Sequence, residues 1–178
     1  MEHTDNSDTK KENFTFRIDP KIMQIIKNRS KTENVSINQY TNNLLRTAVE
    51  WNIHARAAGW IPMPKQILVE LADRLTEDEI PEIAKKKAKE IAQDIILFME
   101  GKYDIDSWLN FMRIRASAAG FQYSEQIEKN KIKCIMHHGL GKKWSLWFTE
   151  FYKSVFSDLN KQTVFDVGEN TISMTITK

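Results

Sequence analysis

Polar and apolar residues alternate strictly over positions 13 to 18 of this 178-residue chain. Successive side chains of a β-strand point to opposite faces, so the alternation separates two sets of side chains. The set able to form hydrogen bonds consists of Asn13, Thr15 and Arg17. Arginine can bond to guanine, asparagine to adenine, and threonine to polar base edges or a thymine methyl group. This face therefore has the chemistry to read base pairs in the major groove of duplex DNA.

The opposite face of the same strand is apolar and consists of Phe14, Phe16 and Ile18. A lone strand of this length leaves its backbone edges unpaired and cannot bury such a face within one subunit. We therefore expect two copies to pair antiparallel across a two-fold axis, with these three side chains in a shared dimer core. The alternative is a strand at the edge of an ordinary sheet, whose polar face is only solvated.

Two helices are expected to follow this strand. Asp19 stands at an N-cap and Pro20 at the first helical position, where its missing N–H is tolerated. Apolar residues then recur at helical spacing. Asn34 suits a left-handed turn, and Ser36 is placed to cap the second helix.

Residues 13–53, in the order strand, cap, helix, turn, cap and helix, resemble the ribbon-helix-helix fold of the Arc, MetJ and CopG repressor family. The resemblance implies an obligate homodimer and base contacts from Asn13, Thr15 and Arg17. It also implies phosphate contacts from the start of the second helix, at Ser36, Ile37 and Asn38. Many members carry glycine in the turn between the helices, whereas Glu33 and Asn34 hold that place here.

The charge of the chain is concentrated locally. The formal net charge is only +2, so a globally basic protein is excluded. Basic residues nevertheless outnumber acidic ones from Lys10 to Lys31, which gives the expected DNA-binding region a positive field. Lys21 and Lys27 are expected to contact phosphates.

Composition bounds the compartment and the partners. A single cysteine excludes an internal disulfide framework and is typical of a reducing cytoplasm. The first residues carry no apolar run, so we expect no secretory signal, and no stretch is apolar enough to cross a bilayer. We therefore expect a cytoplasmic protein with no cofactor and no membrane partner.

The chain is expected to contain four segments: a flexible N-terminal arm at 1–12, the ribbon-helix-helix domain at 13–58, a connector at 59–65 and a C-terminal domain at 66–178. Two prolines and a glycine mark the connector. The last segment reads as helices followed by two hairpins around a helix. The expected fold class is α+β, in which a ribbon-helix-helix swapped dimer precedes a helical segment and a small antiparallel sheet backed by helices.

Three features of the C-terminal segment could form a site. Gly139, Gly141, Lys142 and Lys143 lie where a strand passes into a helix N-terminus, which attracts anions, so a small anionic effector is one candidate and a plain glycine turn the other. Strand alternation separates His137 from Cys134 and His138, so no metal site is expected. The lysines at 85–89 are expected to form a solvated helix face, with a second DNA contact as the alternative.

No carboxylate pair, activated nucleophile or metal motif indicates an active site, so we do not expect an enzyme. The expected function is sequence-specific binding of double-stranded DNA by a homodimer, which could form a higher oligomer on DNA. A transcriptional regulator, such as a repressor, fits this function. One alternative is the antitoxin of a toxin–antitoxin pair, and another is a ligand-binding or scaffold protein that uses the ribbon only to dimerise. Arg17 favours DNA, because a ribbon that only dimerises needs no cation on its outer face.

Overall fold

The structure is a computed structural model that describes residue 15 and residues 17–177. The chain forms two compact units, Met1–Leu44 and Leu45–Lys178. The division falls inside helix α2 (Ile37–Thr47).

Unit 1 contains helix α1 (Pro20–Thr32) and the first part of α2. The Asp19 carboxylate caps α1 by accepting a hydrogen bond of 2.7 Å from the Lys21 amide. Asn34 takes the left-handed conformation, with φ of 54°, and the Ser36 hydroxyl caps α2 by accepting from the Gln39 amide at 3.1 Å. The caps and the turn expected from the sequence are thus confirmed, and glycine is not needed in this turn.

The expected ribbon-helix-helix fold class, with its swapped-dimer ribbon, is wrong at the N-terminus. Thr15 and residues 17–19 belong to no strand, and the first strand among the described residues begins at Gln122. Alternation can mark a strand only where another strand offers an edge, and every strand of the described chain pairs within a single sheet in unit 2. Asn13, Phe14 and Phe16 lie outside the described residues.

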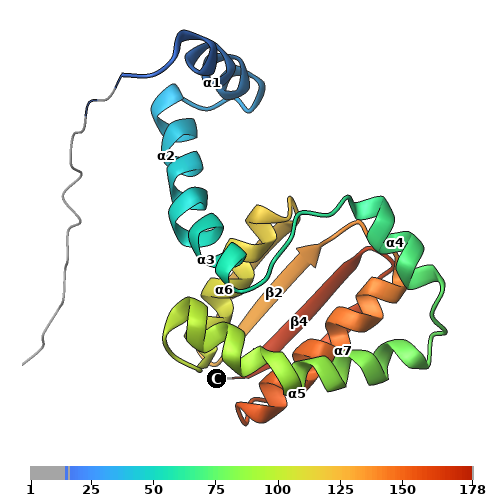
Figure 1. The fold of residues 1–178 in the computed structure, drawn as a ribbon. Helices are drawn as coiled ribbons and strands as arrows, with labels where there is room; N and C mark the ends of the chain where they lie inside the picture. Colours follow the sequence, from blue (N-terminus) through green and yellow to red (C-terminus); the bar gives the residue numbers. More distant parts are fainter. Residues whose placement is uncertain (1–14, 16, 178) are drawn as a thin grey trace, which may run out of the picture. The chain divides into compact units, whose positions relative to one another are not determined.

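Unit 2 begins with helical turns that continue α2. A π-helical turn η1 (Ala48–Asn52) leads into α3 (Ile53–Ala57), and Gly59 in the turn that follows has a φ of 83°. The helices α4 (Lys65–Asp73), α5 (Glu79–Glu100) and α6 (Ile105–Ala118) follow (Figure 1).

The helix starts of unit 2 follow local rules. Thr76 and Glu79 form a capping box: the Glu79 carboxylate accepts from the Thr76 amide at 2.7 Å, and the Thr76 hydroxyl accepts from the Glu79 amide at 3.3 Å. The bond from the Thr76 amide, together with one that the Thr76 hydroxyl donates to the same carboxylate at 2.9 Å, holds the pKa of Glu79 below its usual value. Asp104 caps α6 by accepting from the Ser107 amide, which likewise lowers the pKa of Asp104.

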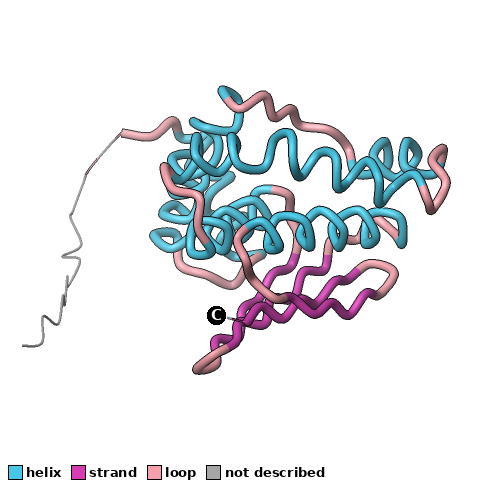
Figure 2. Tube along the Cα trace, turned by 90° about the horizontal axis from the view of Figure 1, so that it is seen from below, coloured by secondary structure: helices cyan, strands magenta, loops and turns pink. Residues whose placement is uncertain are grey.

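An antiparallel sheet completes unit 2. Its strands β1 (Gln122–Ile127), β2 (Lys131–His137), β3 (Thr163–Val167) and β4 (Thr171–Thr177) lie in the order β1-β2-β4-β3, and α7 (Lys142–Asp158) joins β2 to β3. Cys134 of β2 lies opposite Glu125 of β1 and Met174 of β4. Alternate residues of β2 and β4 are buried, because helices cover one face of the sheet while the other face is open (Figure 2). The antiparallel sheet backed by helices agrees with the sequence.

The core of unit 2 lies between this covered face and the helices α5, α6 and α7. Its largest side chains are aromatic, and Trp108, Phe148, Tyr152 and Phe156 are each at most 1% exposed. Trp51 and Trp60 pack against the same core. The division between the units at 44/45 lies before these tryptophans.

Candidate functional site

The residues expected to read bases lie next to α1. Thr15 and Arg17 are exposed and precede the Asp19 cap, and Ile18 is half-buried. Asn13 lies outside the described residues. The structure thus leaves the Arg17 guanidinium accessible before a basic helix, and neither Thr15 nor Arg17 lies on a strand.

The residues expected to contact phosphates also lie on unit 1. Lys21 and Lys27 are exposed on α1, and Ser36, Ile37 and Asn38 are exposed at the start of α2. The Ser36 hydroxyl accepts from the Gln39 amide and can still donate its own proton. A helix N-terminus with accessible amides and a hydroxyl is suited to a phosphate oxygen.

The described residues of unit 1 carry an excess of positive charge. From residue 15 to residue 44 there are five basic side chains and two acidic ones. The recorded ion pairs of the described chain begin at Arg46, so none involves those basic residues. These basic residues are Arg17, Lys21, Lys27, Arg29 and Lys31.

The lysine cluster of α5 is different. Lys85 lies 3.3 Å from Glu150, Lys86 lies 3.8 Å from Glu90 and Lys87 lies 2.7 Å from Glu90. The pKa of Glu90 is lowered, first by the hydrogen bond from Lys87. Lys89 of the same cluster is exposed and is in none of these ion pairs, so three of the four α5 lysines are paired, whereas none of the basic residues at 17–31 is.

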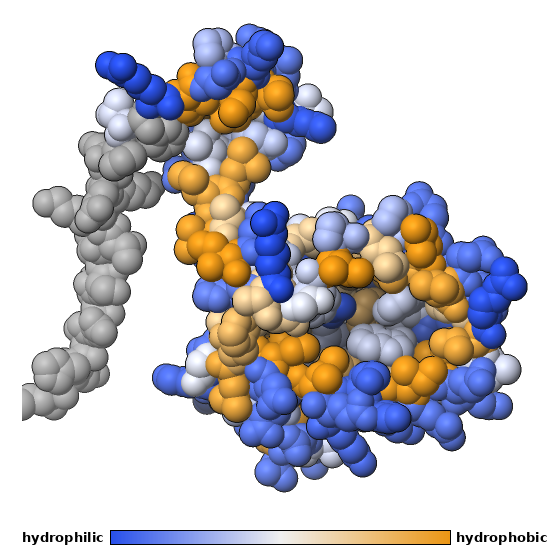
Figure 3. All heavy atoms as spheres, in the orientation of Figure 1, coloured by the Kyte–Doolittle hydropathy of each residue, from blue (hydrophilic) through white to orange (hydrophobic). Residues whose placement is uncertain are grey.

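Unit 1 also exposes apolar side chains. Only Ile26 and Ser30 of its described residues are buried. Ile22 and Ile25 of α1 are 54% and 60% exposed, and Leu44 of α2 is 46% exposed. Apolar side chains accordingly reach the surface on both helices (Figure 3). Unit 1 therefore has too little core of its own.

The expected anion turn is occupied by protein contacts. The Gly141 amide donates to the Asn170 side chain at 2.9 Å, and the Leu140 amide donates to Nδ1 of His138 at 3.0 Å. Lys142 pairs with Glu77 at 2.9 Å. The Lys143 ammonium donates to two backbone carbonyls after α4, at 3.0 and 2.7 Å. These groups hold the turn against neighbouring loops, so the geometry is that of a structural glycine turn.

His138 organises this turn from inside the core. It is 1% exposed, and its Nε2 lies 2.9 Å from the Ser145 hydroxyl, which donates in turn to the Glu169 carbonyl at 3.0 Å. Burial lowers the pKa of His138 to about 4, with smaller contributions from His137 and Lys65. The ring therefore stays neutral, with Nδ1 as acceptor and Nε2–H as donor.

The remaining candidate ligands do not converge. Cys134 is buried, and burial raises the pKa of its thiol to about 11, whereas His137 is exposed and bonds to Thr171 at 2.8 Å. Within the described chain, no group of three or more His, Cys, Asp or Glu side chains could hold a metal ion. No helix in that part is long and apolar enough to span a membrane.

A cavity in unit 2 was missed by the sequence reasoning. Its volume is about 780 Å³, and Arg115, Trp60 and Phe121 are among its lining residues. The available signal was Arg115, a cation at helical spacing from the buried Phe111 and Met112 of α6. A charge on an apolar stripe indicates either a buried partner or a pocket.

Neither the protein-family models nor the curated proteins contain a match to this chain.

Proposed function

We propose that this protein binds double-stranded DNA through unit 1 as a homodimer and regulates transcription. The observation that carries the proposal is the unpaired positive charge of the described residues 17–31, whereas Lys85, Lys86 and Lys87 of α5 have carboxylate partners. Polyanionic DNA binds such a surface by releasing condensed counterions. A basic helix whose charges are already paired with carboxylates would gain much less affinity for DNA.

The homodimer follows from the incomplete core of unit 1. Ile22, Ile25, Ile37 and Leu44 remain between 39% and 60% exposed. Covering one such half-exposed side chain stabilises by about 1 kcal/mol, so four from each of two chains supply roughly 8 kcal/mol, the order of the association cost. A second copy of the same two helices brings a matching apolar surface and doubles the positive charge.

Different residues of unit 1 then have different roles on DNA. Lys21 and Lys27 contact phosphates from α1, and Ser36, Ile37 and Asn38 present the α2 N-terminus to another phosphate. Arg17 reaches a base edge from the segment before α1. Arg17→Ala should weaken the preferred site by about 1–3 kcal/mol and flatten the sequence preference, which a random-library DNA selection measures.

The test of the phosphate role is the salt dependence of DNA affinity. A double variant, Lys21→Gln with Lys27→Gln, should bind all duplexes more weakly and lower the slope of log affinity against log salt by about one per lost contact. The matched control, Lys86→Gln with Lys87→Gln, removes two lysines that the structure pairs with Glu90. Equal slopes for the two double variants would contradict the proposal and favour a protein that only dimerises.

A further inference from the structure

The cavity of unit 2 is walled mainly by aromatic and aliphatic side chains. It lies between α3, the segment from residue 58 to residue 65, and parts of α5, α6 and α7. Five of its lining residues are aromatic: Trp51, Trp60, Phe121, Trp144 and Phe148. Its volume of about 780 Å³ is within the range of pockets that enclose small organic ligands.

The aromatic walls are held in place by the fold. The rings of Trp51 and Trp60 meet edge to face at 5.3 Å between centroids. The Trp144 indole donates to the Leu68 carbonyl at 3.0 Å, which ties α7 to α4. Two prolines stiffen the segment that carries Trp60. The cavity is therefore set by packed rings and a rigid segment, and does not need a ligand to form.

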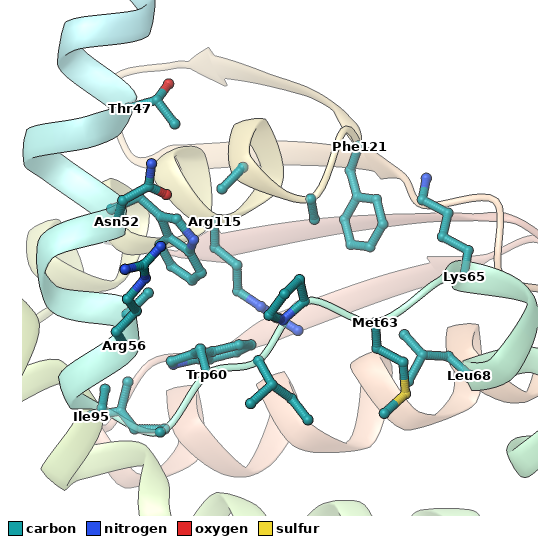
Figure 4. A pocket seen from close by; sticks show the side chains of 18 of the residues that line it. Thr47, Asn52, Arg56, Trp60, Met63, Lys65, Leu68, Ile95, Arg115 and Phe121 are labelled. Atoms are coloured by element: carbon teal, nitrogen blue, oxygen red, sulfur yellow. The ribbon is translucent and has the colours of Figure 1, made fainter.

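Arg115 places a positive charge in this apolar wall. Figure 4 shows its side chain reaching from α6 into the cavity beside Trp60. The guanidinium lies 5.1 Å from the Trp60 ring centroid and 5.4 Å from that of Phe148. Its hydrogen bond goes to the Tyr152 hydroxyl at 3.3 Å. Burial raises the pKa of Tyr152, so this partner is neutral and leaves the charge uncompensated.

The other charged groups around the cavity are also cations. Lys65 lies 4.8 Å from the Phe121 ring centroid and donates to the His138 carbonyl at 3.4 Å, and Arg56 lines the opposite wall. Among the described residues that line the cavity, none is acidic. A half-buried cation without a carboxylate is costly unless an anion can reach it.

We propose that this cavity binds a small aromatic carboxylate. The carboxylate would accept hydrogen bonds from the Arg115 guanidinium, and the aromatic body would pack among the rings of Trp60, Phe121 and Phe148. The 139–143 turn contributes Leu140 to the cavity wall, whereas its two lysines bond elsewhere. Binding requires unit 2 only, so it is measured without DNA and is independent of the role of unit 1.

The test is calorimetric titration of the full chain with 2-naphthoate and with its neutral isostere, 2-naphthamide. The carboxylate should bind saturably, and about tenfold or more tighter than the amide, because only the carboxylate forms an ion pair with the guanidinium. Equal affinities, or no saturable binding of 2-naphthoate, would overturn the proposal. If decanoate bound more tightly than 2-naphthoate, the proposed preference for an aromatic ligand would be wrong.

Two variants on one helix locate the site. Arg115→Met keeps most of the apolar stem and removes the charge, so it should lower 2-naphthoate affinity by about tenfold or more and leave 2-naphthamide affinity unchanged. Arg113→Met is the matched control, because Arg113 pairs with Glu125 at 2.9 Å and does not line the cavity. An equal loss in both variants would refute the assignment. If Arg115→Met does not fold, Arg115→Lys is used to test the role of the charge. This variant keeps a cation, so it should still bind 2-naphthoate more tightly than 2-naphthamide. Loss of that preference in a folded Arg115→Lys protein would refute the role of the charge.

Discussion

Acid should weaken the fold through His138. The Leu140 amide donates to Nδ1 of this ring, so a proton on Nδ1 would break that bond and place a charge in the core. Burial lowers the pKa of His138 to about 4 in the folded chain. In the unfolded chain the pKa returns to about 6.5.

The sign and size of the effect follow from these two values. In the unfolded chain His138 binds a proton below about pH 6.5, whereas in the folded chain it does so only below about pH 4. The free energy of unfolding therefore falls as the pH falls. The free energy of unfolding falls by about 3 kcal/mol in total through this effect, and its slope against pH is at most about 1.4 kcal/mol per pH unit. The full contribution of His138 to stability is present above the pKa that this residue has in the unfolded chain.

The assay is urea unfolding of the full chain at several pH values, from about 7.5 to about 4. His138→Asn keeps an acceptor for the Leu140 amide but does not titrate, so it should lose less stability between these limits than wild type. Carboxylates contribute equally to both proteins and cancel in the difference. His137→Asn, at the exposed neighbour, should follow wild type. A His138→Asn profile parallel to that of wild type would refute the reasoning.

Three further predictions concern unit 2. Cys134 is 1% exposed, and its thiol pKa is raised to about 11. A maleimide should therefore label it only when urea unfolds the chain. Labelling in buffer at the rate of a free thiol would contradict its burial. Ile96→Ala should lower the free energy of unfolding by about 2–5 kcal/mol, because Ile96 is fully buried; a loss well below 1 kcal/mol would place it outside the core. The fragment 45–178 should unfold cooperatively at nearly the Tm of the full chain. The fragment 66–178 lacks Trp51 and Trp60, which pack against the core, and should unfold at a lower Tm. The reverse order would place the boundary between the units at the connector 59–65.

Local signals in the sequence predicted local structure well. Asp19 and Ser36 cap helices where their types and spacing indicated. Alternation in β2 and β4 matches their burial, because both strands have a partner and a covered face. The same alternation at residues 13–18 misled, since the pattern cannot say whether a neighbouring edge exists.

The cavity could be predicted only in part. Arg115 on the apolar side of α6 was visible in the sequence as a misplaced charge. Its neighbours Trp60 and Phe148 come from segments far apart in the chain, and tertiary packing alone brings them to its guanidinium. Likewise, only the structure separates the paired lysines of α5 from the unpaired ones of α1.

The most direct measurement of the central claim compares duplex binding by the full chain and by the fragment 45–178, using fluorescence anisotropy over a range of salt concentrations. The full chain should bind as a dimer, with affinity that falls steeply as salt rises. The fragment retains every recorded ion pair but lacks the unpaired cations of unit 1. It should not bind. Equal binding by the fragment and the full chain, or no binding by either, would contradict DNA recognition through unit 1.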